Sequence, residues 1–135
     1  MSKFAGLAVR ADQPSRMTIH HPATGLPLRD ADGAPAWIDL LSMDSKAAQQ
    51  IQRAAQNRRL ERRVRKLTAE DLAAEEIDLL AALTAKWRLL TLDGAAIEVE
   101  CSATNAAELY ALPELAWLRE QVSGFVADRG NFLRT

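Results

Sequence analysis

The sequence has few of the features that place a protein in a membrane or outside the cell. It has a single cysteine, Cys101, so no disulfide can form within the chain, and this usage suits a reducing compartment. No stretch approaches the roughly 20 apolar residues that span a membrane. The start, MSKFAGLAVR, is too short and too weakly apolar for a secretory signal. We therefore expect a soluble, cytoplasmic protein with no membrane partner.

The sequence also lacks an excess of positive charge. Its 17 Lys and Arg residues are balanced by 18 Asp and Glu residues, and the isoelectric point is near 6.1. Dedicated nucleic-acid binders usually have a basic excess. Residues 57–66, NRRLERRVRK, nevertheless combine six positive side chains with one Glu. Because this segment has no aromatic side chain on which a base could stack, a nucleic-acid interaction would depend on its charge alone.

The basic segment has a second interpretation, as the end of a helix. Cations are favourable in the last turns of a helix and anions in the first turns of the next, and an acidic segment follows here at residues 70–78. We expect some of the arginines to pair with Glu70, Glu75 or Asp78, in the same chain or in a neighbouring copy. The candidates for contacting an acidic protein surface are Arg58, Arg59, Arg62 and Arg63.

Motifs for catalysis and for cofactor binding are missing from the sequence. It has no Gly-rich phosphate loop, no GxSxG, no HExxH and no CxxC. The pair His20-His21 is a weak metal candidate, because adjacent residues of a strand point to opposite faces and no third ligand has suitable spacing. We expect a protein that is not an enzyme and has no metal or cofactor.

The first part of the chain, residues 1–43, has the composition of a small β unit after a loose tail. It holds four of the five prolines and the turn-like stretches ATGLP and DADGAP, in which Asp32-Gly33 suits a hairpin turn. The expected strands are residues 17–20, 26–29 and 36–41.

The rest of the chain, residues 44–135, is expected to be mainly helical. A first helix begins with Asp44 as N-cap, and Leu60, Val64 and Leu67 form its narrow apolar stripe. Thr68 and Asp71 resemble a capping box that opens a second helix reaching to residue 90. Its apolar face consists of Leu72, Ile77, Leu79, Leu80, Leu83, Trp87 and Leu90.

The remaining elements are a turn, a short strand and two helices. Asp93-Gly94 makes the turn, residues 96–101 the exposed strand, and Ser102 or Thr104 caps a helix that is interrupted near Pro113. The last helix has an apolar stripe of Leu115, Leu118, Val122, Phe125, Val126, Phe132 and Leu133. The sequence thus predicts an α+β fold, mainly α, in one compact domain: a β-hairpin or meander, a helical hairpin and C-terminal amphipathic helices. We expect core positions for Trp37, Trp87 and Trp117.

Several segments occur in an order and spacing that resemble a known family. They are Trp87 followed by Asp93-Gly94, SATNAAELY at residues 102–110, WLREQVxxFVxxRxNFL at residues 117–133 and, upstream, the polar MDSKAAQQIQRAAQNRRLERR. Together they resemble the tail assembly chaperones of long-tailed bacteriophages and their prophages.

The resemblance implies a small non-enzymatic protein of the bacterial host cytoplasm. Such a chaperone binds the tape-measure protein, promotes polymerisation of the tail-tube protein around it and is absent from the finished virion. The pattern residues carried over by the resemblance are Asn105, Leu109, Tyr110, Trp117, Gln121, Phe125, Arg129, Asn131 and Phe132. Two alternatives remain: a stable structural component of the tail or virion, and a nucleic-acid-binding accessory protein that uses the Arg-rich helix.

The end of the chain places two large apolar residues, Phe132 and Leu133, where burial is difficult. We expect this pair to form a self-association or partner interface, and the protein to be a homo-oligomer.

Overall fold

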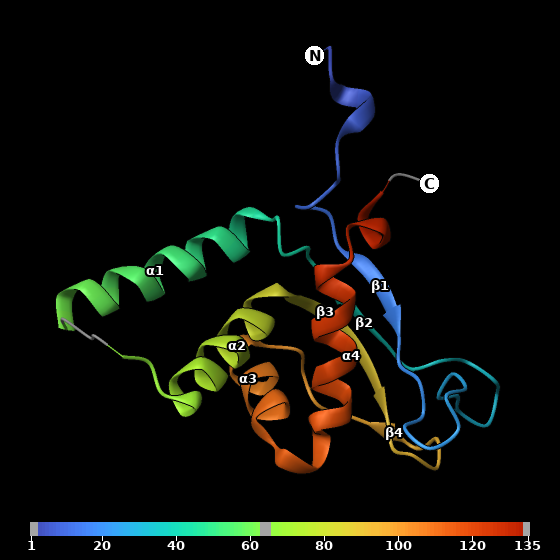
Figure 1. Cartoon of the computed structure of the whole chain (residues 1–135). Helices are drawn as coiled ribbons and strands as arrows, with labels where there is room; N and C mark the ends of the chain where they lie inside the picture. The colour runs from blue at the N-terminus through green and yellow to red at the C-terminus, as the bar shows by residue number, and fades with distance from the viewer. Residues whose placement is uncertain (1–2, 63–65, 134–135) are drawn as a thin grey trace.

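The fold combines helices with one antiparallel sheet, as the sequence predicts (Figure 1). This computed structural model describes residues 3–62 and 66–133, and within them the chain forms four α-helices and four strands in the order β1-β2-β3-β4. The strands are β1 (Ser15–Thr18), β2 (Trp37–Leu40), β3 (Thr84–Leu90) and β4 (Ala96–Ile97). The helices are α1 (Lys46–Arg62), α2 (Ala69–Leu83), α3 (Ala103–Ala111) and α4 (Ala116–Ala127). Short 3-10 helices are η1 (Ala5–Leu7), η2 (Pro113–Leu115) and η3 (Arg129–Phe132).

The N-terminal β unit has two strands where three were expected. Residues 26–29 form only isolated bridges, His20 with Pro27 and Arg29 with Pro35, so the prediction of a strand there is wrong. Proline has no N–H to donate, which interrupts a ladder of hydrogen bonds at both bridges. The predicted turn is confirmed, since Gly33 has a φ of +84° and its N–H donates to the Asp30 carbonyl over 3.0 Å.

The second helix ends earlier than the sequence pattern indicates. It stops at Leu83, and residues 84–90 form β3, so Trp87 and Leu90 lie on a strand and not on the helix. The Thr84 hydroxyl donates to the Leu80 carbonyl over 2.8 Å. Because β3 pairs antiparallel with β2, with Ile38 opposite Trp87, the sheet is built from both parts of the chain.

The core lies between the sheet and the helices α2, α3 and α4. Its fully buried residues include Ile38 and Leu40 from β2, together with the helix residues Leu83, Tyr110, Val122 and Val126. Trp87 and Trp117 are half-buried and pack against this core. Trp37 does not, because it lies on the outer face of the sheet with the Arg16 guanidinium 3.6 Å from the centre of its ring.

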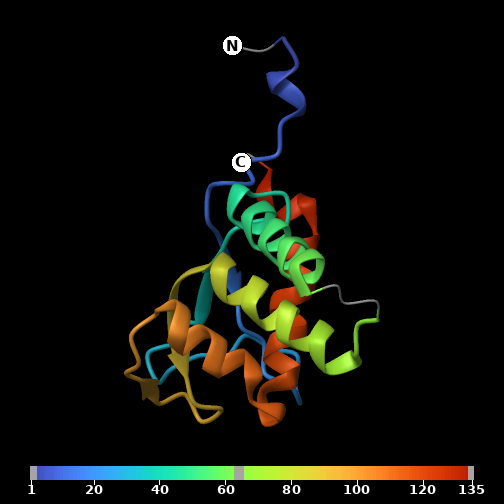
Figure 2. The same ribbon diagram turned by 90° about the vertical axis from the view of Figure 1, so that its left-hand side faces the viewer.

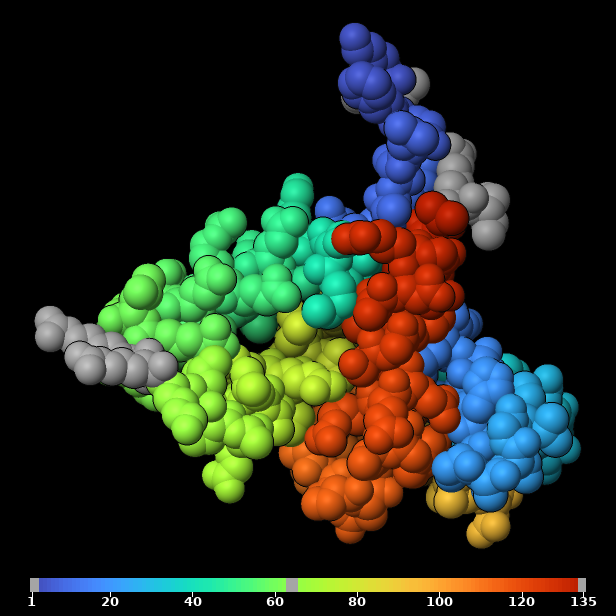
Figure 3. All heavy atoms as spheres, viewed as in Figure 1, coloured from blue at the N-terminus to red at the C-terminus, as the bar shows by residue number. Residues whose placement is uncertain are grey.

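Helix α1 lies at the edge of the molecule and packs against α2 (Figures 1 and 3). Ser45 is its N-cap: the Ser45 hydroxyl accepts the Ala48 N–H over 3.2 Å, whereas the predicted cap, Asp44, pairs with an arginine of η3. The predicted apolar stripe is wrong at Leu60, which is 77% exposed. Leu67 is half-buried, but it lies beyond the end of α1 at Arg62. Val64 lies outside the described residues. The buried face consists instead of Ala48 and Ala55, with Ile51 half-buried.

Three local signals of the C-terminal half are confirmed. Thr68 and Asp71 form the capping box of α2, Gly94 has the φ of +90° that its turn requires, and Ser102 caps α3 by accepting the Asn105 N–H.

The strand expected at residues 96–101 covers only Ala96–Ile97, and Leu72, expected on the apolar face of α2, is 52% exposed, so these two predictions are wrong. The last predicted helix is divided into α4 and η3. Among the described helices, none is long and apolar enough to cross a membrane. Figure 2 shows α4 and η3 running up to the chain end, below the N-terminal segment.

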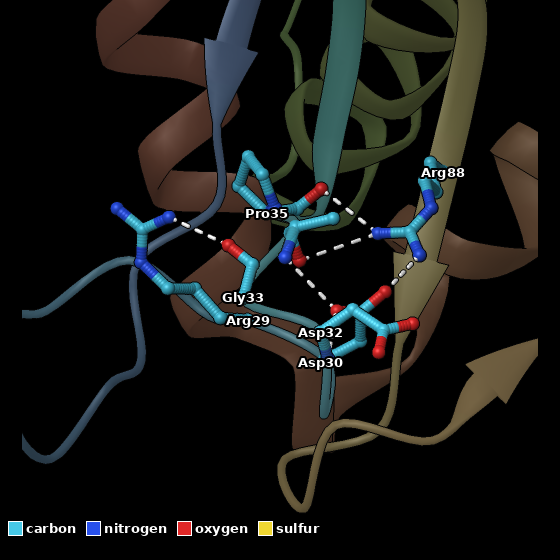
Figure 4. A network of polar contacts seen from close by, with 7 residues as sticks. Arg29, Asp30, Asp32, Gly33, Pro35 and Arg88 are labelled. Carbon is cyan, nitrogen blue, oxygen red and sulfur yellow. Dashed lines mark hydrogen bonds and ion pairs between the residues drawn. The ribbon is translucent and has the colours of Figure 1, made fainter.

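A polar network fixes the turn at residues 29–35 against β3 (Figure 4). The Arg88 guanidinium pairs with the Asp30 carboxylate and donates to the Pro35 carbonyl over 3.1 Å. The hydrogen bond from Arg88 is the main cause that lowers the pKa of Asp30. Arg29 donates to the Gly33 carbonyl over 2.8 Å, so the turn is held from both sides. This network serves the structure, because it joins the turn to β3.

Candidate functional site

An open groove of about 890 Å³ runs between α4 and the N-terminal β unit. Its first wall comes from β1 and the loop after it, and its second from α4 and η3. In Figure 3 these two parts appear side by side, the surface of α4 in red next to the light blue of the residues after β1. We call this surface the α4 groove. The first wall consists of Met17, Thr18, His20, His21, Pro22 and Gly25. The second consists of Trp117, Glu120, Gln121, Gly124, Phe125, Asp128 and Asn131.

The two walls are joined by the side chain of Gln121. Its carbonyl oxygen accepts the His20 N–H over 3.0 Å, and its amide nitrogen donates to the His20 carbonyl over 2.8 Å. A side-chain amide thus pairs with both backbone groups of one residue, as a neighbouring strand would. The loop is therefore attached to α4 through Gln121. The sequence pattern selects this residue but does not give its structural role.

Aromatic side chains form the apolar part of the groove. Trp117 and Phe125 are both half-buried and pack against the core with part of their surface. Phe125 contacts Phe132 edge to face, with ring centres 5.6 Å apart and planes at 72°. Gly124 lies on the same wall, and a Cβ at this position would meet no atom within 4 Å. The groove is hollow at Gly124, because this residue has no side chain to fill it.

Residues of η3 form hydrogen bonds and an ion pair at the end of the groove where Asn131 lies. The Asn131 side chain donates to the Phe125 carbonyl over 3.0 Å, and the Asn131 carbonyl accepts the Ser15 hydroxyl over 2.6 Å. Arg129 forms a bidentate pair with Asp44, with distances of 2.7 and 3.1 Å. The hydrogen bond from Arg129 lowers the pKa of Asp44. Both carried-over residues, Arg129 and Asn131, thus connect the chain end to earlier segments.

The charged groups of the groove are mainly acidic. Glu120 and Asp128 supply carboxylates, and His21 accepts the Ala23 N–H at its Nδ1 over 3.0 Å, which leaves Nε2 as the protonated nitrogen when the ring is neutral. In the part of the chain that the structure describes, no group of three or more His, Cys, Asp or Glu residues could hold a metal ion. The arrangement suits binding of an apolar segment with flanking positive charge.

Several carried-over residues lie in the core and away from the groove. Tyr110 is fully buried, and its hydroxyl shares a 2.7 Å hydrogen bond with the Thr84 hydroxyl. Burial raises the pKa of Tyr110 to about 12. Asn105 donates to the Glu100 carbonyl over 2.9 Å, and Leu109 packs against the core. These positions are accounted for by folding, and Tyr110 is not accessible to a partner.

The two candidates at the chain end, Phe132 and Leu133, differ in their exposure. Phe132 is 2% exposed, so it does not supply the exposed apolar surface expected of it. Phe132 is the buried residue of η3 and contacts Phe125 edge to face, which explains this burial. Leu133 is 56% exposed and remains available for an interface.

The basic candidates lie on α1, remote in sequence from the groove. Arg59 pairs with Glu75 of α2, which confirms one of the expected ion pairs. Arg58, Arg59 and Arg62 line a small hollow together with acidic residues of α2 (Asp71, Glu75 and Asp78). Arg63 lies outside the described residues. The cations of α1 therefore face carboxylates of the same chain, and their field is partly neutralised.

Sequence reasoning does not select the residues of the first wall as partner-binding, nor three of the second, Glu120, Gly124 and Asp128. In the sequence, His20 and His21 form only a weak metal candidate, and Gly25 lies in a turn-like stretch. Gly124 is a local signal in the sequence, because a glycine within a helical stretch weakens the helix or lets another backbone approach. No backbone approaches closely in the structure, since a Cβ at Gly124 would meet no atom within 4 Å. No family model, curated protein or solved structure matches the chain.

Proposed function

We propose that the chain is a non-enzymatic tail assembly chaperone of a long-tailed bacteriophage or prophage. In this proposal it binds the tape-measure protein in the cytoplasm of the bacterial host and promotes assembly of the tail-tube protein around it. The proposal originates in the sequence resemblance, and the observation that supports it best is the clustering of Trp117, Gln121 and Phe125 on one wall of an open groove. Positions that stand out in the sequence pattern thereby share one accessible surface.

The groove has the properties that a helical partner needs. An amphipathic helix can place apolar side chains against Trp117 and Phe125, and flanking Lys or Arg residues against Glu120 and Asp128. The exposed arginines of α1 offer a second contact, to acidic residues of the same partner, which would set its orientation more than its affinity. A tape-measure protein is a long helical rod and provides such repeated surfaces.

Binding to the tape-measure protein encoded with this chain tests the proposal. Its segments are titrated into the purified chain by calorimetry, and the variant Gly124→Leu is compared with Glu108→Leu. The first variant fills the groove, whereas the second adds the same side chain to an exposed position of α3 outside the groove. We expect at least tenfold weaker binding for Gly124→Leu and no change for Glu108→Leu. Equal binding by both variants, or no binding by the unmodified chain, would contradict the proposal.

A stable structural component of the tail is the alternative, and particle composition separates the two. Quantitative mass spectrometry of purified virions measures the copies of this chain per particle. A chaperone is expected to be absent from them. Full stoichiometry in infectious particles would favour the structural role.

A further inference from the structure

The N-terminal arm, which we define as residues 3–9, stands away from the body of the molecule (Figures 1 and 2). Its root is fixed, because the Arg10 N–H donates to the Phe132 carbonyl over 2.9 Å. Beyond this root the arm contains η1, with hydrogen bonds from Leu7 to Phe4 and from Ala8 to Ala5. Leu7 is 82% exposed and Phe4 is 64% exposed.

An arm of this kind suits a docked state better than an isolated one. A single 3-10 turn gains little from its own hydrogen bonds, because ordering the residues costs more than one or two bonds return. Phe4 and Leu7 lie three residues apart, one turn from each other, and both large apolar side chains are exposed to water. A surface that covers both would order the arm.

The α4 groove matches the arm in apolar character and charge. It is open to solvent, and its volume of about 890 Å³ leaves room for large side chains. Trp117 and Phe125 offer aromatic surface beside the hollow at Gly124. The arm carries one cation, Lys3, and no acid, whereas the α4 wall carries the carboxylates of Glu120 and Asp128.

The direction of the arm indicates which copy of the groove it fills. From its root at Phe132 the arm leads away from α4, and the views of Figures 1 and 2 agree on this. The arm of a neighbouring molecule has no such constraint. We propose that the N-terminal arm of one chain docks into the α4 groove of a second copy, with Phe4 and Leu7 as its anchors.

Arm exchange has defined consequences for assembly. Two copies that exchange arms reciprocally form a closed dimer, and copies that pass their arms in one direction form a ring or an open chain. Both use the same contact. The inference goes beyond the proposed function, because purified protein alone tests it. The arm and a tape-measure segment would compete for the α4 groove, but self-association and tape-measure binding are measured separately, so each can fail while the other succeeds.

Complementation between two variants tests the contact. Phe4→Ser/Leu7→Ser removes the anchors and keeps the groove, whereas Gly124→Leu fills the groove and keeps the arm. Sedimentation velocity is expected to show self-association of the unmodified chain and at least tenfold weaker association of each variant alone. An equimolar mixture of the two variants is expected to associate again, through arms from one and grooves from the other. Glu108→Leu serves as the control and should associate like the unmodified chain.

A peptide experiment measures the same contact directly. A fluorescent peptide of residues 1–10 is titrated into the full chain carrying Phe4→Ser/Leu7→Ser, and binding is followed by anisotropy. Adding Gly124→Leu should weaken binding at least tenfold. Circular dichroism checks that each variant is folded, and Glu120→Arg replaces Gly124→Leu if the latter is not. A monomeric unmodified chain, variants that associate unchanged, or a mixture that does not associate would each overturn the proposal.

Discussion

Tyr110 should make the folding stability depend on pH in the alkaline range. It is the only tyrosine of the chain, it is fully buried, and burial raises its pKa from 10 to about 12. The folded state therefore holds the phenolic proton more tightly than the unfolded state does. The resulting stabilisation is complete below pH 10 and is lost as the pH rises through 12.

The magnitude follows from the two pKa values. A tenfold change in proton affinity corresponds to about 1.4 kcal/mol, so the full difference is worth about 2.7 kcal/mol. At about pH 11, midway between the two values, about 1.4 kcal/mol of it should already be lost. The hydrogen bond to Thr84 acts in the opposite direction on the pKa and is the smaller effect.

The variant Tyr110→Phe provides the comparison. It lacks the titrating group and the hydrogen bond to Thr84, whose hydroxyl keeps the Leu80 carbonyl as an acceptor. We expect a loss of about 1 kcal/mol at neutral pH. Between about pH 9 and pH 11, the unmodified chain should lose about 1.4 kcal/mol more than the variant, because lysines and arginines titrate alike in both.

Urea unfolding at both pH values measures these free energies, and tyrosinate absorbance gives an independent reading. Since the chain has one tyrosine, the absorbance of the folded protein reports Tyr110 alone. Ionisation of the folded chain near pH 10, or equal losses of stability in the two proteins, would refute the reasoning.

Two further predictions concern glycine and a helix cap. Gly94→Ala should destabilise the fold by more than about 1 kcal/mol, since φ is +90° and a Cβ would lie 2.6 Å from the Arg29 carbonyl. Gly25→Ala has a similar φ of +71° but open space around it, and should cost less in thermal unfolding; equal losses would refute the role of the close approach. Ser102→Ala should cost about 1 kcal/mol because it removes the N-cap of α3, whereas Thr104→Ala, at the exposed alternative position, should be nearly neutral. Chemical denaturation of both variants checks this, and a larger loss for Thr104→Ala would contradict it.

The features that the sequence predicted correctly have local causes. The capping box of Thr68 and Asp71 and the turns at Gly33 and Gly94 each depend on a few neighbouring residues. Their chemistry is the same in any fold, because a positive φ or an unpaired helix N–H is satisfied within one turn.

The end of α2 could not be predicted in this way. Leu83, Trp87 and Leu90 keep the period of a helix, so the pattern continues smoothly into residues that form β3. The strand exists because β2 pairs with it, and the Tyr110 hydroxyl meets Thr84 at the point of change. These contacts come from distant parts of the chain and override the local periodicity.

The buried face of α1 was missed for a different reason. The sequence pattern indicates large apolar residues as its core contacts, yet Leu60 is exposed while Ala48 and Ala55 are buried. Small side chains let the N-terminal part of α1 approach its neighbours closely. A pattern of large apolar residues cannot predict a buried face that is made of alanines.

The sequence selects residues of one wall of the α4 groove but does not predict the groove. The resemblance selected Trp117, Gln121 and Phe125, which share one wall. The opposite wall comes from the loop after β1, which only the tertiary structure brings beside α4. The bond between Gln121 and the His20 backbone shows why: it joins positions separated by 101 residues.

The chain end illustrates how the structure changes the interpretation of an apolar pair. Phe132 lies in the core, its carbonyl holds the root of the N-terminal arm, and the Asn131 carbonyl accepts a bond from Ser15. Deleting residues 131–135 would therefore destabilise the fold and release the arm together, so it could not isolate an interface. Leu133→Ser changes only an exposed side chain. A loss of self-association in that variant without a loss of stability would assign Leu133 to the interface, and unchanged association would leave the arm and the α4 groove as the surfaces that join two copies.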